Sequence, residues 1–121
     1  MWAAVDAGLA INPGGIVAQV EGGIIQAASW TLREAVPTEG RLIISESWKD
    51  YPILRFGDIP EMRVAVISNP DHPSVGVGEV AMGPTAGAIA NAVARALGVR
   101  IRDFPITRDR IIETIMADGG T

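Results

Sequence analysis

Apolar residues recur along this chain with two different periods, and each period predicts a different kind of element. Between residues 14 and 35 they are spaced by three or four, which is the repeat of an α-helix. These helical positions are Val17, Val20, Ile24, Ala27, Thr31 and Ala35. Residues 61–68 alternate instead, with Met62, Val64 and Val66 on one face, which predicts a strand with a buried side.

Two more helices are predicted in the second half of the chain. The first covers residues 84–97, because Pro84 fits a first turn and Gly98 ends the apolar run. The second follows Thr107, a suitable N-cap, and extends to residue 117. Residues 118–121 are expected to fray.

Shorter apolar runs bounded by turn residues predict the remaining strands. They cover residues 2–7, 41–48, 51–56 and 101–106. Together with residues 61–68, they indicate an α+β fold: a mixed sheet of about four to five strands, two long apolar helices and a short C-terminal helix. At 121 residues the chain is long enough for one domain, and no linker or repeat divides it.

The composition excludes several classes of function. A net charge of −4 leaves no basic stripe to neutralise phosphates, so nucleic acid is not an expected partner. The chain has no cysteine and a single histidine, which excludes disulfides, thiolate-bound zinc and protein-ligated iron–sulfur clusters, and no metal site is predicted. No apolar run reaches the roughly 18–20 residues of a membrane span. The absence of cysteine leaves the compartment open.

The helix predicted at residues 84–97 is apolar on nearly every side. Arg95 is its only charged residue, and alanine occupies every second position from Ala86 to Ala96. Such a helix has to be covered on nearly every side, and a domain of this size has little material for that. We therefore expect residues 1–121 to form a single domain that is a fragment of a larger protein.

Gln19, Gly22, Gly23 and Gln26 lie close to one face of the first predicted helix. Each interior glycine costs about 1 kcal/mol relative to alanine, so both glycines need a reason. One interpretation is close packing against another element, for which glycine leaves room. The other is a carboxamide-bearing face against a flat, hydrogen-bonding ligand. The residue types alone leave both open.

Residues 74–79 form a glycine-rich loop that ends in Glu79, shortly before the second long helix. One interpretation is structural, with Glu79 capping the helix or satisfying the loop. Another is a catalytic base, kept ionised by the positive helix end and brought close to a ligand by Gly76 and Gly78. Residues 76–81 also match the dinucleotide pattern G-x-G-x-x-G/A. We reject that function, because a proline-rich loop precedes the pattern and its acidic side chain would repel a pyrophosphate.

Three segments taken together resemble a known family. Residues 5–13 are similar to its D-x-G-x-x-x-N-P motif, residues 18–26 to its G-Q-x-E-G-G-x-x-Q-G helix, and residues 76–79 to its G-x-G-E loop. The motifs keep the family's order, and the resemblance spans roughly residues 3–116. The chain resembles the C-terminal part of the molybdenum-cofactor-binding large subunit of the xanthine dehydrogenase/aldehyde oxidase family, of the isoquinoline 1-oxidoreductase β-subunit type.

The resemblance implies a chemistry and the residues that perform it. A glutamate at the position of Glu79 is the general base of a hydroxylation, in which water-derived oxygen is added to an N-heterocycle or an aldehyde. Gln19 contacts the molybdenum centre or its pterin, and Gly78 lies beside the same cofactor. Gly22 and Gly23 are assigned to the cofactor-binding residues as well. The absence of cysteine is no objection, because the sulfur ligands belong to molybdopterin itself.

Three positions depart from the family's pattern. Residues 80–81 are Val-Ala where the family has Pro-Pro, and Ala18 replaces a glycine.

The implied partners are the remainder of the large subunit, a [2Fe–2S] subunit or domain, and the small-molecule substrate. The chain alone is expected to be inactive and to hold no cofactor tightly. The alternative is a non-catalytic α+β module for subunit assembly or small-ligand binding.

Overall fold

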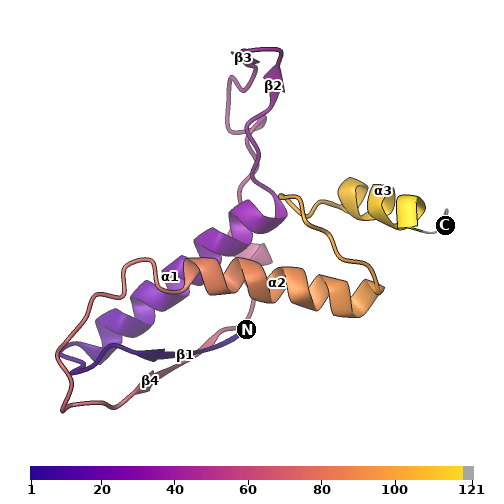
Figure 1. Ribbon diagram of the computed structural model, residues 1–121. Helices are drawn as coiled ribbons and strands as arrows, with labels where there is room; N and C mark the ends of the chain where they lie inside the picture. The colour runs from indigo at the N-terminus through magenta and orange to yellow at the C-terminus, as the bar shows by residue number, and fades with distance from the viewer. Residues whose placement is uncertain (119–121) are drawn as a thin grey trace.

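Three helices and four short strands make up residues 1–118, the part of the chain that this computed structural model describes (Figure 1). In chain order the elements are β1 (Trp2–Asp6), α1 (Pro13–Leu32), β2 (Thr38–Glu39), β3 (Leu42–Ile43), a 3-10 turn (Phe56–Asp58), β4 (Arg63–Ile67), α2 (Met82–Leu97) and α3 (Arg108–Asp118). β1 and β4 pair in parallel, and β2 pairs antiparallel with β3. α1 packs against both β4 and α2.

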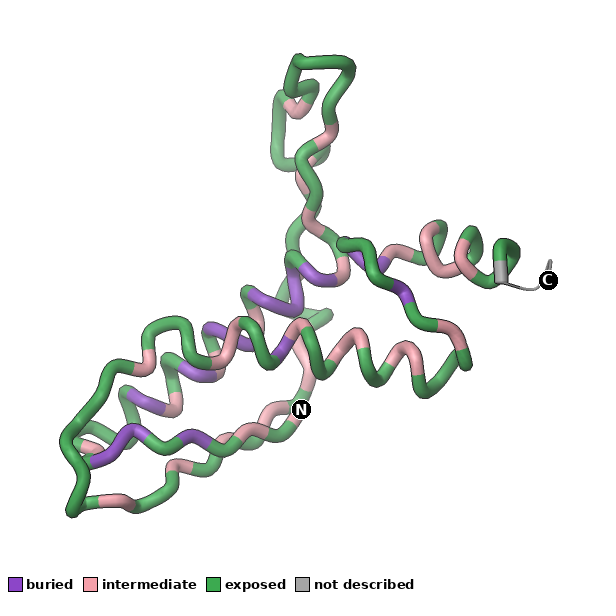
Figure 2. Tube along the Cα trace, in the orientation of Figure 1, coloured by how far each residue is buried: buried purple, intermediate pink, exposed green. Residues whose placement is uncertain are grey.

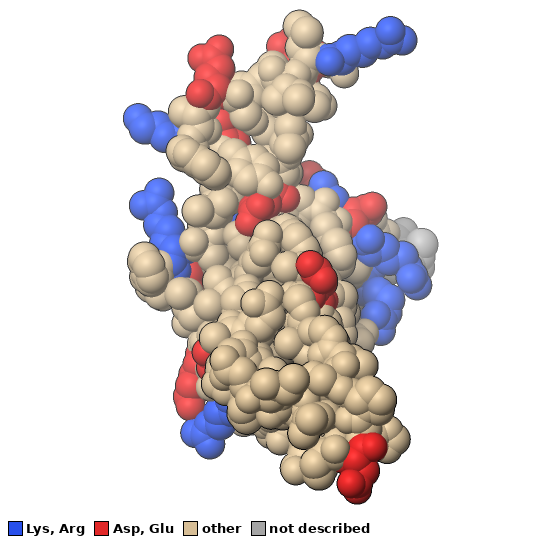
Figure 3. Space-filling view, turned by 90° about the vertical axis from the view of Figure 1, so that its left-hand side faces the viewer, with Lys and Arg blue, Asp and Glu red and all other residues tan. Residues whose placement is uncertain are grey.

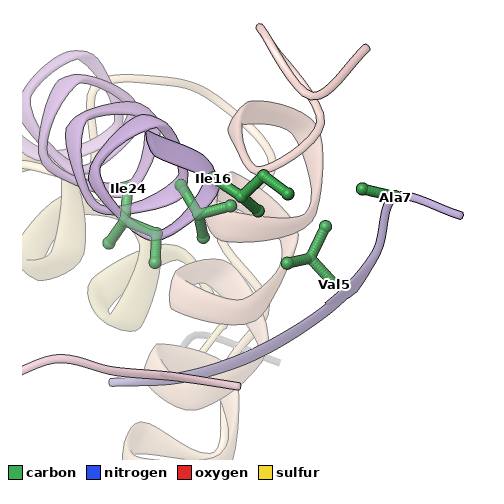
Figure 4. Packing of buried hydrophobic residues seen from close by; sticks show 5 residues of the cluster. Val5, Ala7, Ile16 and Ile24 are labelled. Atoms are coloured by element: carbon green, nitrogen blue, oxygen red, sulfur yellow. The ribbon is translucent and has the colours of Figure 1, made fainter. Parts of the chain in front are cut away.

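The core lies between α1 and the β1–β4 pair. The three- and four-residue spacing places Ile16, Val20 and Ile24 on one stripe of α1, facing Val5 and Ala7 of the first strand and its end (Figure 4). Each of these five residues is at most 9% exposed. Full burial of one such large aliphatic side chain contributes about 1.5–3 kcal/mol. Buried residues follow α1 and β1 and become sparse elsewhere (Figure 2).

The α+β class and all three predicted helices are confirmed, and residues 2–7 and 61–68 contain β1 and β4. The predicted N-cap role of Thr107 is confirmed as well, because its hydroxyl accepts the N–H of Arg110 at 3.3 Å. The four strands form two separate two-stranded sheets rather than one mixed sheet. Most of the fraying predicted for residues 118–121 concerns residues outside the described part of the chain.

Three predicted strands are wrong or shortened. Residues 41–48 contain only β3, and residues 51–56 and 101–106 form no strand. Prolines at 52 and 105 each remove a main-chain donor that a ladder needs. The apolar Ile106 is instead buried at the C-terminal end of α1, where its N–H donates to the carbonyl of Thr31 at 2.7 Å.

An arm, residues 36–48, projects from the body between α1 and β4 and carries the β2–β3 hairpin (Figure 1). Gly40 adopts a φ of 59° in the turn, a conformation that favours glycine. The apolar tip is bare: Leu42, Ile43 and Trp48 are 72%, 69% and 76% exposed. The segment that follows the arm is fastened to the body, since the N–H of Leu54 donates to the Ser29 hydroxyl at 2.9 Å.

α2 has little cover within residues 1–118. Only Thr85 of this helix is buried, although Arg95 is its one charged residue. The helix therefore shows the incomplete burial that its composition predicts. Within the same residues no helix combines the length and apolar character needed to cross a lipid bilayer.

Candidate functional site

Asp6 ties the end of β1 to the segment that follows β4. Its carboxylate accepts the N–H of Gly8 at 2.8 Å and the side-chain amide of Asn69 at 2.9 Å. The Gly8 bond, the Asn69 bond and the nearby charge of His72 together hold the pKa of Asp6 below its ordinary value. The ionised carboxylate is therefore the form that closes this junction.

Asp6 should make the contact between the end of β1 and the segment after β4 sensitive to acid. Because the pKa of Asp6 is lowered in the folded state, the unfolded chain takes up this proton first as the pH falls. Its contribution to stability is complete above the unfolded pKa of about 3.9 and is lost as the pH falls through the folded value. In Asp6→Asn we expect this part of the pH dependence to be absent. Thermal midpoints of both chains between about pH 6 and about pH 2 test it.

Asp50 also has a lowered pKa, and it provides the internal control for that comparison. The Ser47 hydroxyl and the Glu46 N–H lower the pKa of Asp50, far along the chain from Asp6. Asp50 is present in both proteins, so its acid dependence cancels in the difference. Midpoint curves that run parallel for wild type and Asp6→Asn would contradict the role given to Asp6.

Gly8 lets the loop after β4 approach the end of β1. It has a φ of 65°, and a Cβ at this position would overlap the main-chain carbonyl of Pro73. Two hydrogen bonds fix the approach: Leu9 N–H to the His72 carbonyl at 2.9 Å, and Val75 N–H to the Ala7 carbonyl at 3.0 Å. The start of the glycine-rich loop is thus held against the β1–α1 turn.

The N-terminal end of α1 opens onto the same loop. Asn12 is the N-cap, and its side-chain oxygen accepts the N–H of Gly15 at 3.0 Å. Between this helix end and the loop lies a cleft of about 430 Å³, the α1–loop cleft. Its lining combines the polar residues and glycines Asn12, Gly15, Gln19, Ser74 and Gly78 with the apolar Ile11, Ile16, Val75 and Val77, and has no charged side chain. The N–H groups of Gly15 and Ile16 are already bonded to Asn12, so the partial positive charge of the helix end and the neutral polar side chains are what favour an anionic or strongly polar ligand.

Gln19 and Gly78, predicted from separate motifs, are in direct contact. The side-chain amide of Gln19 donates to the carbonyl of Gly78 at 2.9 Å, joining residues 59 positions apart in the chain. Both residues line the α1–loop cleft. Gln19 is exposed, so its second polar atom remains accessible from the cleft side.

Glu79 follows Gly78 directly and is exposed. Its main-chain carbonyl accepts the N–H of Met82 at 3.1 Å, which turns the chain into α2. The N-cap of α2 is Ala81, and no side chain caps this helix. The interpretation of Glu79 as a helix cap is therefore wrong.

The two neighbouring glycines of α1 have different surroundings. Gly23 is buried, and a Cβ there would lie 3.3 Å from the Ala81 Cβ and 3.8 Å from the Met82 side chain. Close packing of α1 on α2 explains this glycine. Gly22 is exposed, and a Cβ there would have no atom within 4 Å. Residues 1–118 thus give no packing reason for Gly22.

The site lies at one end of the molecule, where the β1–α1 and β4–α2 connections meet (Figure 1). Viewed from this side, the surface of the lower body shows few charged groups (Figure 3). The predicted Gln19 and Gly78 come together here, with Glu79 next to them. Gly22 follows one turn along α1, and Gly23 is turned towards α2.

Sequence reasoning missed the residues that hold this site together. Asp6, Gly8, Asn12 and Asn69 position the loop and the helix end, yet only the two motif segments around Gln19 and Glu79 received functional roles. The motif at residues 5–13 was the available signal, since it contains Asp6, Gly8 and Asn12. Asn69 had no comparable signal, because its bond to Asp6 joins residues 63 positions apart.

Known proteins share both the sequence and the fold of this chain. Residues 1–60 match the family model of the molybdopterin cofactor-binding domain. The chain is 40% identical over 114 residues to a nicotinate dehydrogenase subunit of Pseudomonas putida, covering 94% of this chain and 10% of that protein. It is 36% identical over 106 residues to the isoquinoline 1-oxidoreductase β-subunit of Brevundimonas diminuta, covering 88% of this chain and 13% of the relative.

A solved structure of a related enzyme is similar to this chain as well. Quinoline 2-oxidoreductase from Pseudomonas putida 86 superposes with a TM-score of 0.85 at 33% identity, over 95% of this chain and 16% of that one. The chain thus spans between a tenth and a sixth of the length of these proteins.

Proposed function

Because the chain belongs to the molybdopterin cofactor-binding family of the xanthine dehydrogenase/aldehyde oxidase type, we propose that it forms one wall of the active site of a molybdenum hydroxylase. The proposed substrate is a small N-heterocycle or an aldehyde. The names of the relatives above, which refer to nicotinate, isoquinoline and quinoline, favour an N-heterocycle. The proposed partners are the remainder of the large subunit and a [2Fe–2S] subunit or domain.

One observation carries this proposal: the hydrogen bond from Gln19 to the carbonyl of Gly78. It brings the helix motif and the G-x-G-E loop to one cleft, as a shared ligand site requires. Alternative modules that only assemble subunits have no need for an exposed carboxamide between a helix N-terminus and a glycine loop.

The residues of the cleft fit the molybdenum cofactor. Molybdopterin carries a phosphate and a pterin rich in hydrogen-bonding groups, and the cleft offers neutral polar side chains beside the N-terminus of α1. When bound, the cofactor supplies the two-electron redox chemistry of the enzyme. In this proposal Gln19 and Gly78 contact the cofactor, and the open side of Gly22 lets it approach the helix backbone.

We assign Glu79 the role of general base. Its carboxylate is exposed, does not cap α2, and follows a residue that lines the cleft. A carboxylate at this position can accept a proton from a reacting water-derived oxygen. The chain alone lacks the rest of the pocket, so it is expected to be inactive by itself.

Gln19→Glu tests the cleft in the complete enzyme. The change keeps the shape of the side chain, removes the donor to the Gly78 carbonyl and adds a negative charge beside an anionic cofactor. A lost hydrogen bond at an exposed site costs about 0.5–1.5 kcal/mol, and charge repulsion adds to it. We expect molybdenum content per protein to fall by about tenfold or more.

The matched control is Asn91→Asp, the same carboxamide-to-carboxylate change at an exposed position of α2 outside the α1–loop cleft. Molybdenum content is measured by elemental analysis of both purified variants. Wild-type content in Gln19→Glu, or an equal loss in both variants, would remove the cleft from the proposed site.

A further inference from the structure

Within the described part of the chain, β1 and β4 form a sheet of two parallel strands. Parallel sheets are normally covered on both faces, and an isolated pair of strands is at best marginally stable. Within residues 1–118 no third strand joins this pair. A sheet of this kind is completed by other polypeptide.

The bonds at the start of β1 show which of its main-chain groups face β4. The amine of Met1 donates to the Glu61 carbonyl, and the Met1 carbonyl accepts the N–H of Arg63 at 2.9 Å. Because main-chain groups alternate along a strand, those of Ala3 and Val5 face β4 as well. The main-chain N–H and C=O groups that point to the opposite, free edge belong to Trp2, Ala4 and Asp6.

A groove of about 340 Å³, the β1 groove, runs along β1. It is formed by residues 1–6, by Val20 and Ile24 of α1, and by Ala81, Thr85 and Ala88 at the start of α2. Its walls are mostly apolar. An unpaired strand edge beside an apolar wall fits an extended segment, which can bond to β1 through its main chain and place apolar side chains against the helices.

We propose that a strand from the remainder of the large subunit adds to the free edge of β1 within the β1 groove. The inference rests on the proposed function, since it takes the chain as one part of a larger subunit. The occupant follows from length: the matched proteins are so much longer that this chain covers 10–16% of them. The far face of the sheet also lacks cover, with Trp2 82% and Ile67 49% exposed. One large body covers the edge and the face together.

Hydrogen exchange in the complete large subunit tests the added strand. In β1 the amides of Ala3 and Val5 bond to β4, so they serve as references within the same strand. We expect the amides of Trp2, Ala4 and Asp6 to exchange as slowly as these references, within about tenfold, and at least about 100-fold more slowly than unpaired amides. Residue-level exchange measured by mass spectrometry with fragmentation gives both sets in one experiment.

A variant pair localises the occupant. Ala88→Arg places a long charged side chain in the β1 groove, whereas Ala92→Arg makes the same change one turn further along α2, outside it. Both alanines are exposed, so neither change disturbs the core of the chain. We expect Ala88→Arg to speed exchange at Trp2, Ala4 and Asp6 by about tenfold or more, with Ala3 and Val5 unchanged. Ala92→Arg is expected to leave all five amides as in the wild type.

The wild-type measurement decides the proposal even if Ala88→Arg does not fold. Fast exchange at Trp2, Ala4 and Asp6 beside slow exchange at Ala3 and Val5 overturns it. Protection that disappears on dilution, as a dimer dissociates in sedimentation, assigns the edge to a second copy and overturns it too. Molybdenum content and turnover of the same preparation separate the two proposals. If the enzyme is active but the amides at the free edge of β1 exchange fast, only the proposal of the added strand is overturned. If those amides are protected in a subunit that contains no molybdenum, the added strand is supported and the proposed function is not.

Discussion

In the complete enzyme, Glu79→Gln is expected to lower kcat by about 10²–10⁴-fold, the range that a general base contributes. The substitution keeps the size of the side chain and removes its ability to accept a proton. Because no side-chain cap of α2 is lost, the fold of residues 1–118 is expected to persist. Molybdenum content should therefore stay near that of the wild type while turnover fails. Steady-state kinetics and elemental analysis on the same preparation measure both.

Glu113→Gln on α3 is the matched control, since it makes the same change on an exposed glutamate far along the chain from the cleft. It is expected to keep normal kcat. Near-normal turnover in Glu79→Gln would refute the assignment of the base and strengthen the alternative of a non-catalytic module. A loss of molybdenum together with activity would instead make Glu79 a residue of cofactor binding.

Gly8→Ala is expected to be the most destabilising single methyl addition in the β1–α1 turn. The left-handed φ of Gly8 costs alanine about 1–2 kcal/mol, and the new Cβ would also overlap the Pro73 carbonyl. A main-chain carbonyl cannot move aside as a flexible side chain can, so we expect a total loss of about 3 kcal/mol or more. Displacing Pro73 also displaces the loop that ends in Glu79. Chemical denaturation measures the first effect, and turnover of the complete enzyme measures the second.

Gly40→Ala is the control that separates the cost of a left-handed φ from the cost of a steric overlap with Pro73. Gly40 has nearly the same φ, 59°, but a Cβ there would have no atom within 4 Å. Its expected loss is only the conformational cost, about 1–2 kcal/mol. Equal losses in Gly8→Ala and Gly40→Ala would show that the contact between the β1–α1 turn and Pro73 is unimportant.

Local sequence pattern predicted the elements whose apolar residues repeat with a regular period. The helical spacing from Val17 to Thr31 identified α1, and the alternation at residues 62–66 identified β4. Strand predictions failed where apolar residues are used for other contacts. Ile101 and Ile106 look like strand residues, yet both are buried in an irregular segment, and the N–H of Ile106 donates to Thr31 at the end of α1. Such a use depends on tertiary packing, which a local window does not contain.

The sequence motifs singled out residues that the fold brings together, but not the contacts that hold them in place. Gln19, Gly78 and Glu79 carry chemistry that a resemblance can point to, and the first two are in contact. The pairing of Asp6 with Asn69 and of Gly8 with Pro73 comes from the parallel register of β1 and β4. No local pattern encodes that register. The different reasons for Gly22 and Gly23 likewise became visible only when α2 was in place.

The bare hairpin arm has a consequence for how this polypeptide must be produced. Leu42 and Ile43 are exposed on one strand of a two-residue ladder with open edges, and the exposed Trp48 follows it in the arm. Exposed apolar side chains beside unpaired main-chain N–H and C=O groups promote aggregation during synthesis. A cell or an expression host that releases this segment alone should accumulate insoluble material. Soluble yield should rise when the proposed remainder of the large subunit is synthesised together with it.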